Sequence, residues 1–154
     1  MAAPIIQTRR GWTIETEEFP EEPPARLAAY HNRYKREFPL NELRRGPTAA
    51  YNCFGMVFAV RRASVMETSI ETILQDDRYR RLRQEEHPSV GDVAIYKEGA
   101  EIEHAGVLVG FKEPIMEGGS RIPIVMSKWG PGPEYIHLIE SAPYGKVEIW
   151  TDRS

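Results

Sequence analysis

Cys53 is the only cysteine of the chain, and its position suits a nucleophile. A thiol becomes a nucleophile when its pKa is lowered, and the N-terminus of a helix lowers it by favouring the thiolate. Asn52 is a good helix-capping residue, and apolar residues follow Cys53, so we expect the thiol at the start of a buried helix. The alternative is a small buried hydrophobic residue, which is the commoner fate of a lone cysteine.

His104 is the best candidate among the four histidines for the base that such a thiol needs. It opens the apolar segment 104–110, and a histidine at the end of a buried strand can face the start of a buried helix. The alternative is a strand-end histidine bonded to a backbone carbonyl. We expect His31 and His87 at the surface.

A third polar group usually orients the base, and it is expected from the segment 124–130. Side chains alternate across a strand, so Ser127 and Lys128 cannot both face the site. Ser127 is preferred because it can accept from the imidazole N–H, whereas the cation of Lys128 would repel an imidazolium. His137 is an alternative orienter. Asn52 and the backbone N–H of Cys53 are candidates for stabilising an oxyanion.

The elements that must position these residues fall into two halves. Apolar residues recur at spacings of three and four over residues 25–37, and helices are also predicted after Asn52 and over residues 66–76. The N-terminal lead, residues 1–24, is expected to be extended and to add an edge strand through Ile5, Ile6, Trp12 and Ile14. Short strands separated by glycine turns are predicted at 79–83, 92–96, 104–111, 122–127, 135–139 and 147–150. Helices followed by an antiparallel sheet predict an α+β fold, in one domain over residues 1–154.

Composition excludes several classes of protein. A net charge of −3, from 20 basic and 23 acidic residues, argues against a nucleic-acid partner. No apolar stretch suits a signal peptide or a membrane span, so we expect a cytoplasmic protein without a membrane partner, with a signal-independent export route left open. Metal-ligand pairs and phosphate-binding glycine loops are absent from the sequence, so no metal or cofactor is expected. The arginine pairs are expected on solvated faces, although Arg44, Arg45 and Arg61 could bind an anionic partner.

Residues 52–57 (Asn-Cys-Phe-Gly-Met-Val) resemble the nucleophile motif of the NlpC-type, papain-like cysteine peptidases. Residues 91–96 and 103–110 are similar to that family's paired central strands, including its catalytic histidine, and the related CHAP-type amidases carry a similar pair. Residues 127–130 (Ser-Lys-Trp-Gly) resemble the Asn-Ser-Trp-Gly motif of papain-type proteases, with serine in place of the orienting residue. The papain-type glutamine before the cysteine is missing. The resemblance covers roughly residues 45–140 and extends to small bacterial proteins. It implies a papain-like catalytic core over residues 45–154, preceded by an N-terminal extension and helix over residues 1–44.

This resemblance implies a papain-like α+β hydrolase in which Cys53 attacks a carbonyl, His104 transfers the proton and Ser127 orients His104. The expected substrate is an amide bond in a protein or in peptidoglycan. Hydrolysis, deamidation and transpeptidation all fit this chemistry. The alternatives are a signal-less bacterial effector or toxin, which would travel with an inhibitor or immunity protein, and a catalytically inactive papain-like binding module.

Overall fold

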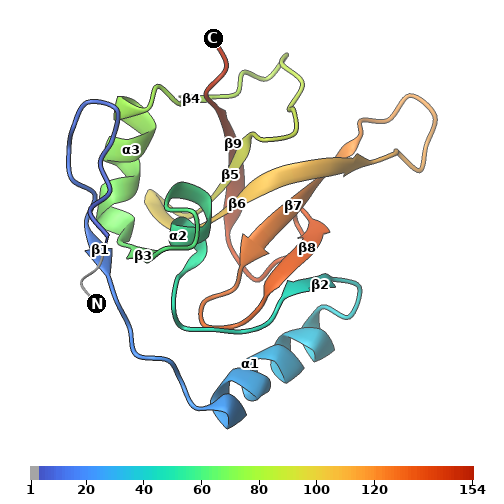
Figure 1. Ribbon diagram of the computed structural model, residues 1–154. Helices are drawn as coiled ribbons and strands as arrows, with labels where there is room; N and C mark the ends of the chain where they lie inside the picture. Colours follow the sequence, from blue (N-terminus) through green and yellow to red (C-terminus); the bar gives the residue numbers. More distant parts are fainter. Residues whose placement is uncertain (1–3) are drawn as a thin grey trace.

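The fold is built around a seven-stranded antiparallel sheet. The structure, a computed structural model, describes residues 4–154 (Figure 1). The strand order in the large sheet is β2-β8-β7-β6-β5-β9-β4, and a separate two-stranded sheet joins β1 to β3. The strands are β1 (Thr16–Glu17), β2 (Glu42–Arg45), β3 (Ser64–Val65), β4 (Arg80–Arg81), β5 (Val93–Glu98), β6 (Glu101–Lys112), β7 (Ile122–Lys128), β8 (Glu134–Leu138) and β9 (Lys146–Thr151). The expected α+β class with an antiparallel sheet is confirmed.

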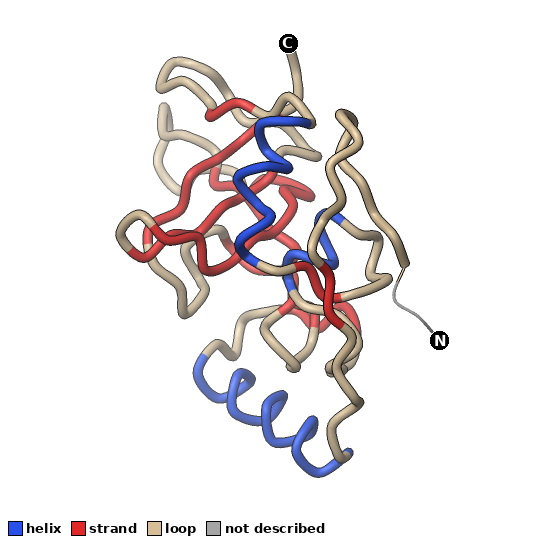
Figure 2. The backbone as a smooth tube through the Cα atoms, turned by 90° about the vertical axis from the view of Figure 1, so that its left-hand side faces the viewer, coloured by secondary structure: helices blue, strands red, loops and turns tan. Residues whose placement is uncertain are grey.

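The helices are α1 (Pro24–Glu37), α2 (Cys53–Phe58) and α3 (Ile70–Asp76), with a short 3-10 turn (Glu67–Ser69) before α3. All three predicted helices are present, although α3 begins at Ile70 and the 3-10 turn takes the start of the segment 66–76. Helices α2 and α3 pack on one side of the sheet, while α1 lies apart from them at one end of the molecule (Figure 2). No helix within residues 4–154 is long and apolar enough to span a membrane.

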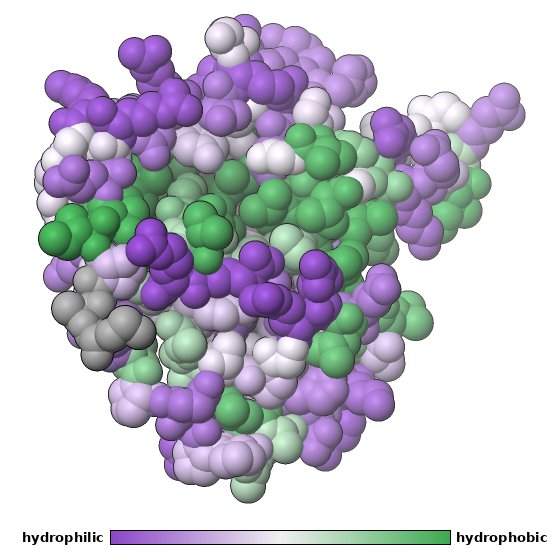
Figure 3. All heavy atoms as spheres, in the orientation of Figure 1, coloured by the Kyte–Doolittle hydropathy of each residue, from purple (hydrophilic) through white to green (hydrophobic). Residues whose placement is uncertain are grey.

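Two apolar clusters lie on the two faces of the sheet. Ile95 and Ala105 belong to the cluster that also holds Cys53 and the inner side of α3. Tyr96 and Leu108 belong to the other cluster. Neighbouring residues thus point to opposite faces, as strand geometry requires. In the space-filling view the apolar side chains form a band across the middle of the molecule, and hydrophilic side chains gather at the top (Figure 3).

The lead does not add an edge strand to the large sheet, contrary to expectation. Both edges of that sheet are taken by β2 and β4, and β1 pairs with β3 instead. Ile14 is buried in the cluster of α3, and the hydroxyl of Thr8 donates to Asp76 at the end of that helix (2.6 Å). The lead therefore covers α3 rather than extending the sheet.

Strand β2 was not predicted. Its four residues, Glu-Leu-Arg-Arg, do not alternate between apolar and polar side chains, and all four are exposed. It forms because its backbone pairs with β8, with Leu43 opposite Tyr135.

Candidate active site

Asn52 holds the start of α2 in place. Its side-chain oxygen accepts from the backbone N–H groups of Gly55 (2.8 Å) and Val65 (3.1 Å), and its amide donates to the Val65 carbonyl (2.9 Å). The first two bonds satisfy N–H groups that would otherwise lack partners at a helix start and beside β3. The predicted cap is confirmed, and Cys53 is the first residue of the helix.

Cys53 is buried, with 7% of its surface exposed. Burial raises the pKa of its thiol to about 11, because desolvation disfavours the thiolate. The backbone N–H groups of Ala105 and Phe54 and the charge of Lys128 act in the opposite direction but do not outweigh burial. The thiol is therefore protonated at neutral pH in this conformation, which differs from the lowered pKa expected of a helix start.

His104 is enclosed by aromatic rings. It stacks on Tyr144 with ring centres 3.8 Å apart and an angle of 13°, and Tyr96 lies 5.2 Å away. Only 1% of its surface is exposed, and its Nε2 has no hydrogen-bond partner. Burial and the neighbouring His137 hold the pKa of His104 well below its usual range, so the ring is neutral.

Cys53 packs near the part of β6 that carries His104, but the two side chains are not hydrogen-bonded to each other. The thiol lies in the same cluster as Ala105, the residue after His104. Because side chains alternate, the His104 ring leaves the strand on the opposite side from Ala105. Within residues 4–154 no hydrogen bond joins His104 to Cys53 or to Ser127.

Ser127 is bonded to His137 and not to His104, contrary to the predicted pairing. Its Oγ lies 2.7 Å from His137 Nε2 and accepts from the indole N–H of Trp129 (2.9 Å). His137 Nδ1 lies 2.8 Å from the Leu138 carbonyl, so the ring proton sits there and Nε2 is the acceptor. The Ser127 hydroxyl thus donates to His137 and accepts from Trp129, and neither bond involves His104. His31, expected at the surface, is half-buried and lies 3.1 Å from the Tyr135 hydroxyl.

Lys128 points to the side of Cys53, contrary to the preference for Ser127. The side chain is completely buried, and its ammonium donates to the carbonyls of Thr48, Gly130 and Gly132, each at 2.6 Å. Burial lowers the pKa of Lys128 to about 8, against the opposing field of Glu134. Of the two neighbours on β7, Lys128 is the one whose charge acts on the thiol.

Glu134 is the centre of a buried polar cluster that was not predicted. It receives two bonds from Arg61 (2.6 and 2.9 Å) and one from the Tyr51 hydroxyl (2.5 Å). Burial alone would raise the pKa of Glu134, and these donors outweigh it and hold the pKa below its usual range. Arg61 was expected on a solvated face, but its guanidinium forms an ion pair with the buried carboxylate of Glu134.

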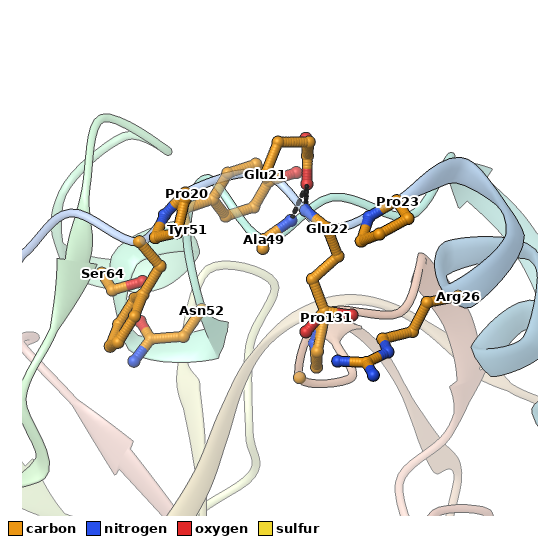
Figure 4. Close-up of a pocket in the computed structure, with 12 residues that line it drawn as sticks. Pro20, Glu21, Glu22, Pro23, Arg26, Ala49, Tyr51, Asn52, Ser64 and Pro131 are labelled. Atoms are coloured by element: carbon orange, nitrogen blue, oxygen red, sulfur yellow. Dashed lines mark hydrogen bonds between the residues drawn. The ribbon is translucent and has the colours of Figure 1, made fainter.

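An apolar-walled cavity lies between the N-terminal extension and the start of α2. Its volume is about 530 Å³, and Asn52, the neighbour of Cys53, lines it (Figure 4). Residues 19–23, here called the strap, form one wall. The strap is held by Glu21, whose carboxylate accepts from the Thr48 hydroxyl (2.5 Å) and the Ala49 N–H (2.7 Å).

The buried imidazoles predict a loss of stability in acid. Burial lowers the pKa of both His104 and His137 in the folded state. Below the ordinary histidine pKa of about 6.5 the unfolded chain binds protons that the folded chain does not. The free energy of unfolding therefore decreases as the pH is lowered. We expect a slope of up to about 1.4 kcal/mol per pH unit for each ring, measured by urea unfolding between about pH 7 and pH 5.

His104→Phe keeps an aromatic ring against Tyr144 and removes one of these titrating groups. Its pH slope should be about half that of the wild type, whereas His87→Gln, at an exposed position, should leave the slope unchanged. An undiminished slope in His104→Phe would show that His104 is not the buried neutral ring described above.

No group of three or more histidine, cysteine or acidic side chains in residues 4–154 is arranged to hold a metal ion. No family model matches the chain, and no curated protein or solved structure is significantly similar to it.

Proposed function

We propose that the protein is a cysteine hydrolase of papain-like, NlpC-type organisation, acting on an amide bond. The observation that carries this proposal is the position of Cys53: it begins a capped helix and packs against the strand residue that follows His104. A nucleophile on a rigid helix start and a base on the adjoining strand are the two groups that acyl transfer requires.

In the proposed reaction Cys53 Sγ attacks the carbonyl carbon while His104 takes the thiol proton. A neutral imidazole is the form that can accept this proton, and burial keeps His104 neutral. The backbone N–H of Cys53 is the proposed donor to the oxyanion. His104 then protonates the leaving amine, and water attacks the resulting thioester to release the acid and the free thiol.

The conformation described above fits this scheme only if the free protein also samples one in which the His104 ring, which leaves β6 on the side away from Ala105, reaches the thiol. Catalytic hydrogen bonds are often long before the substrate is bound. For the third group, Lys128 replaces Ser127 as the candidate on the thiol side, because its ammonium partly offsets the rise that burial causes in the pKa of Cys53. The proposed substrates are an amide of peptidoglycan or, for a signal-less bacterial effector or toxin, a cytosolic protein.

The test is the pH dependence of the alkylation rate at Cys53, in the wild type and in His104→Ala. Since the chain has one thiol, the rate reports on one site. For the proposed enzyme we expect a reactive fraction below the free-cysteine pKa of about 8.5 that disappears without His104. A slow reaction that follows a pKa near 11 and ignores His104 would reject the enzyme.

A second candidate function is a catalytically inactive binding module on the same fold. Two observations favour it: the raised pKa of Cys53 and the unpartnered Nε2 of His104. Such a module would keep its partner through Cys53→Ala and His104→Ala, whereas an enzyme would lose turnover in both.

A further inference from the structure

The cavity beside Asn52 and Cys53 combines apolar walls with three charged side chains, those of Glu21, Glu22 and Arg26. Its volume of about 530 Å³ lies within the range of small-ligand sites, roughly 300 to 1,000 Å³. Phe19, Tyr51 and Pro131 supply aromatic and proline surface. Glu22 and Arg26, both from the N-terminal extension, line the same space.

Glu22 and Arg26 do not neutralise each other. Glu22 Oε2 is buried and has no hydrogen-bond partner, and no ion pair or hydrogen bond joins the two residues in the part of the chain that the structure describes. Both side chains extend toward Pro131 (Figure 4). The neighbouring Glu21 differs, because its two oxygens are used by Thr48 and Ala49. A buried acceptor without a donor is unfavourable, so the free oxygen of Glu22 indicates a place for a ligand donor.

The mixed charge selects the kind of ligand. A simple cation would be attracted by Glu22 and repelled by Arg26. A simple anion would be attracted by Arg26 and repelled by Glu22. A neutral amide satisfies both side chains, since its N–H can donate to the carboxylate and its oxygen can accept from the guanidinium. The apolar walls suit a side chain attached next to that amide.

We propose that Glu22 and Arg26 form a recognition site for an amide group with an adjacent aromatic or aliphatic side chain. The N-terminal extension, which lies outside the segment that resembles known hydrolases, thereby builds a ligand site next to Cys53. That this ligand is the substrate rests on the proposed function; the binding itself does not.

The experiment measures binding of three phenyl compounds to the full chain carrying Cys53→Ala, by amide chemical shifts in NMR. N-acetylphenylalanine amide is neutral and carries amide groups, phenylethylamine is a cation, and 3-phenylpropionate is an anion. We expect the diamide to bind most tightly and to shift resonances of the strap and of residues 51–52. Glu22→Leu and Arg26→Met should each weaken the diamide about tenfold.

Glu18→Gln and Arg36→Met are the matched controls, because both positions are exposed and lie outside the cavity lining. They should leave the affinity unchanged. Equal binding of all three compounds, no binding of the diamide, or indifference to Glu22→Leu in a folded variant would overturn the proposal. Each of these results can coexist with His104-dependent alkylation of Cys53, so failure of the site is distinguishable from failure of the hydrolase.

Discussion

Gly55→Ala is expected to destabilise the fold by about 3 kcal/mol or more. A Cβ atom at position 55 would lie 1.9 Å from the carbonyl oxygen of Ala63, far inside van der Waals contact. The obstacle is backbone, so no change of rotamer relieves it. Either α2 or the segment leading into β3 must move, and Asn52 holds the two together. Urea unfolding at neutral pH measures the effect.

Gly46→Ala is the matched control for this prediction. No atom lies within 4 Å of a Cβ at Gly46, and its backbone is not in the left-handed region. We expect a change within about 0.5 kcal/mol. A stable Gly55→Ala protein would mean that α2 does not approach Ala63 as closely as described.

The second large effect is expected from Glu134→Gln. Glu134 is fully buried and accepts from Arg61 and Tyr51, so the substitution leaves the Arg61 charge without its partner. Removing one member of a buried pair costs about 3–5 kcal/mol, and we expect the lower end because Arg61 is 27% exposed. Thermal or urea unfolding of the variant checks this value.

The exposed pair of Arg33 and Glu37 provides the comparison, with exposed fractions of 60% and 43%. Glu37→Gln should cost less than about 1 kcal/mol. Combining Glu134→Gln with Arg61→Met should recover part of the loss, because the unpaired charge is then gone. Simple additivity of the two single changes would contradict the coupling assigned to this pair.

Local patterns predicted the elements that have local causes. The spacing of Leu27, Tyr30 and Tyr34 predicts α1, and Asn52 predicts the start of α2; both are present. The strands of the second half follow from apolar alternation between glycine turns. Strand β2 was not predicted because its exposed residues form a strand only through pairing with β8.

The site was harder to predict because its details depend on distant partners. Arg61 and Glu134 are 73 positions apart, and no local signal joins them. Alternation correctly required Ser127 and Lys128 to face opposite sides, but which one faces Cys53 depends on the packing of β7 against β8 and α2. The cap at Asn52 is visible in the sequence, whereas the depth at which Cys53 is buried, and therefore its raised pKa, follows from tertiary packing.

The three carbonyl bonds of Lys128 have a mechanical consequence for the cavity beside Cys53. The ammonium joins the segment before the nucleophile, through Thr48, to the turn after β7, through Gly130 and Gly132. Ala49 and Gly130, one from each of these segments, line the cavity. A single buried cation therefore joins two walls of the cavity, and the charge of the same ammonium acts on the Cys53 thiol. The shape of the cavity and the acidity of the thiol are thereby coupled through one residue.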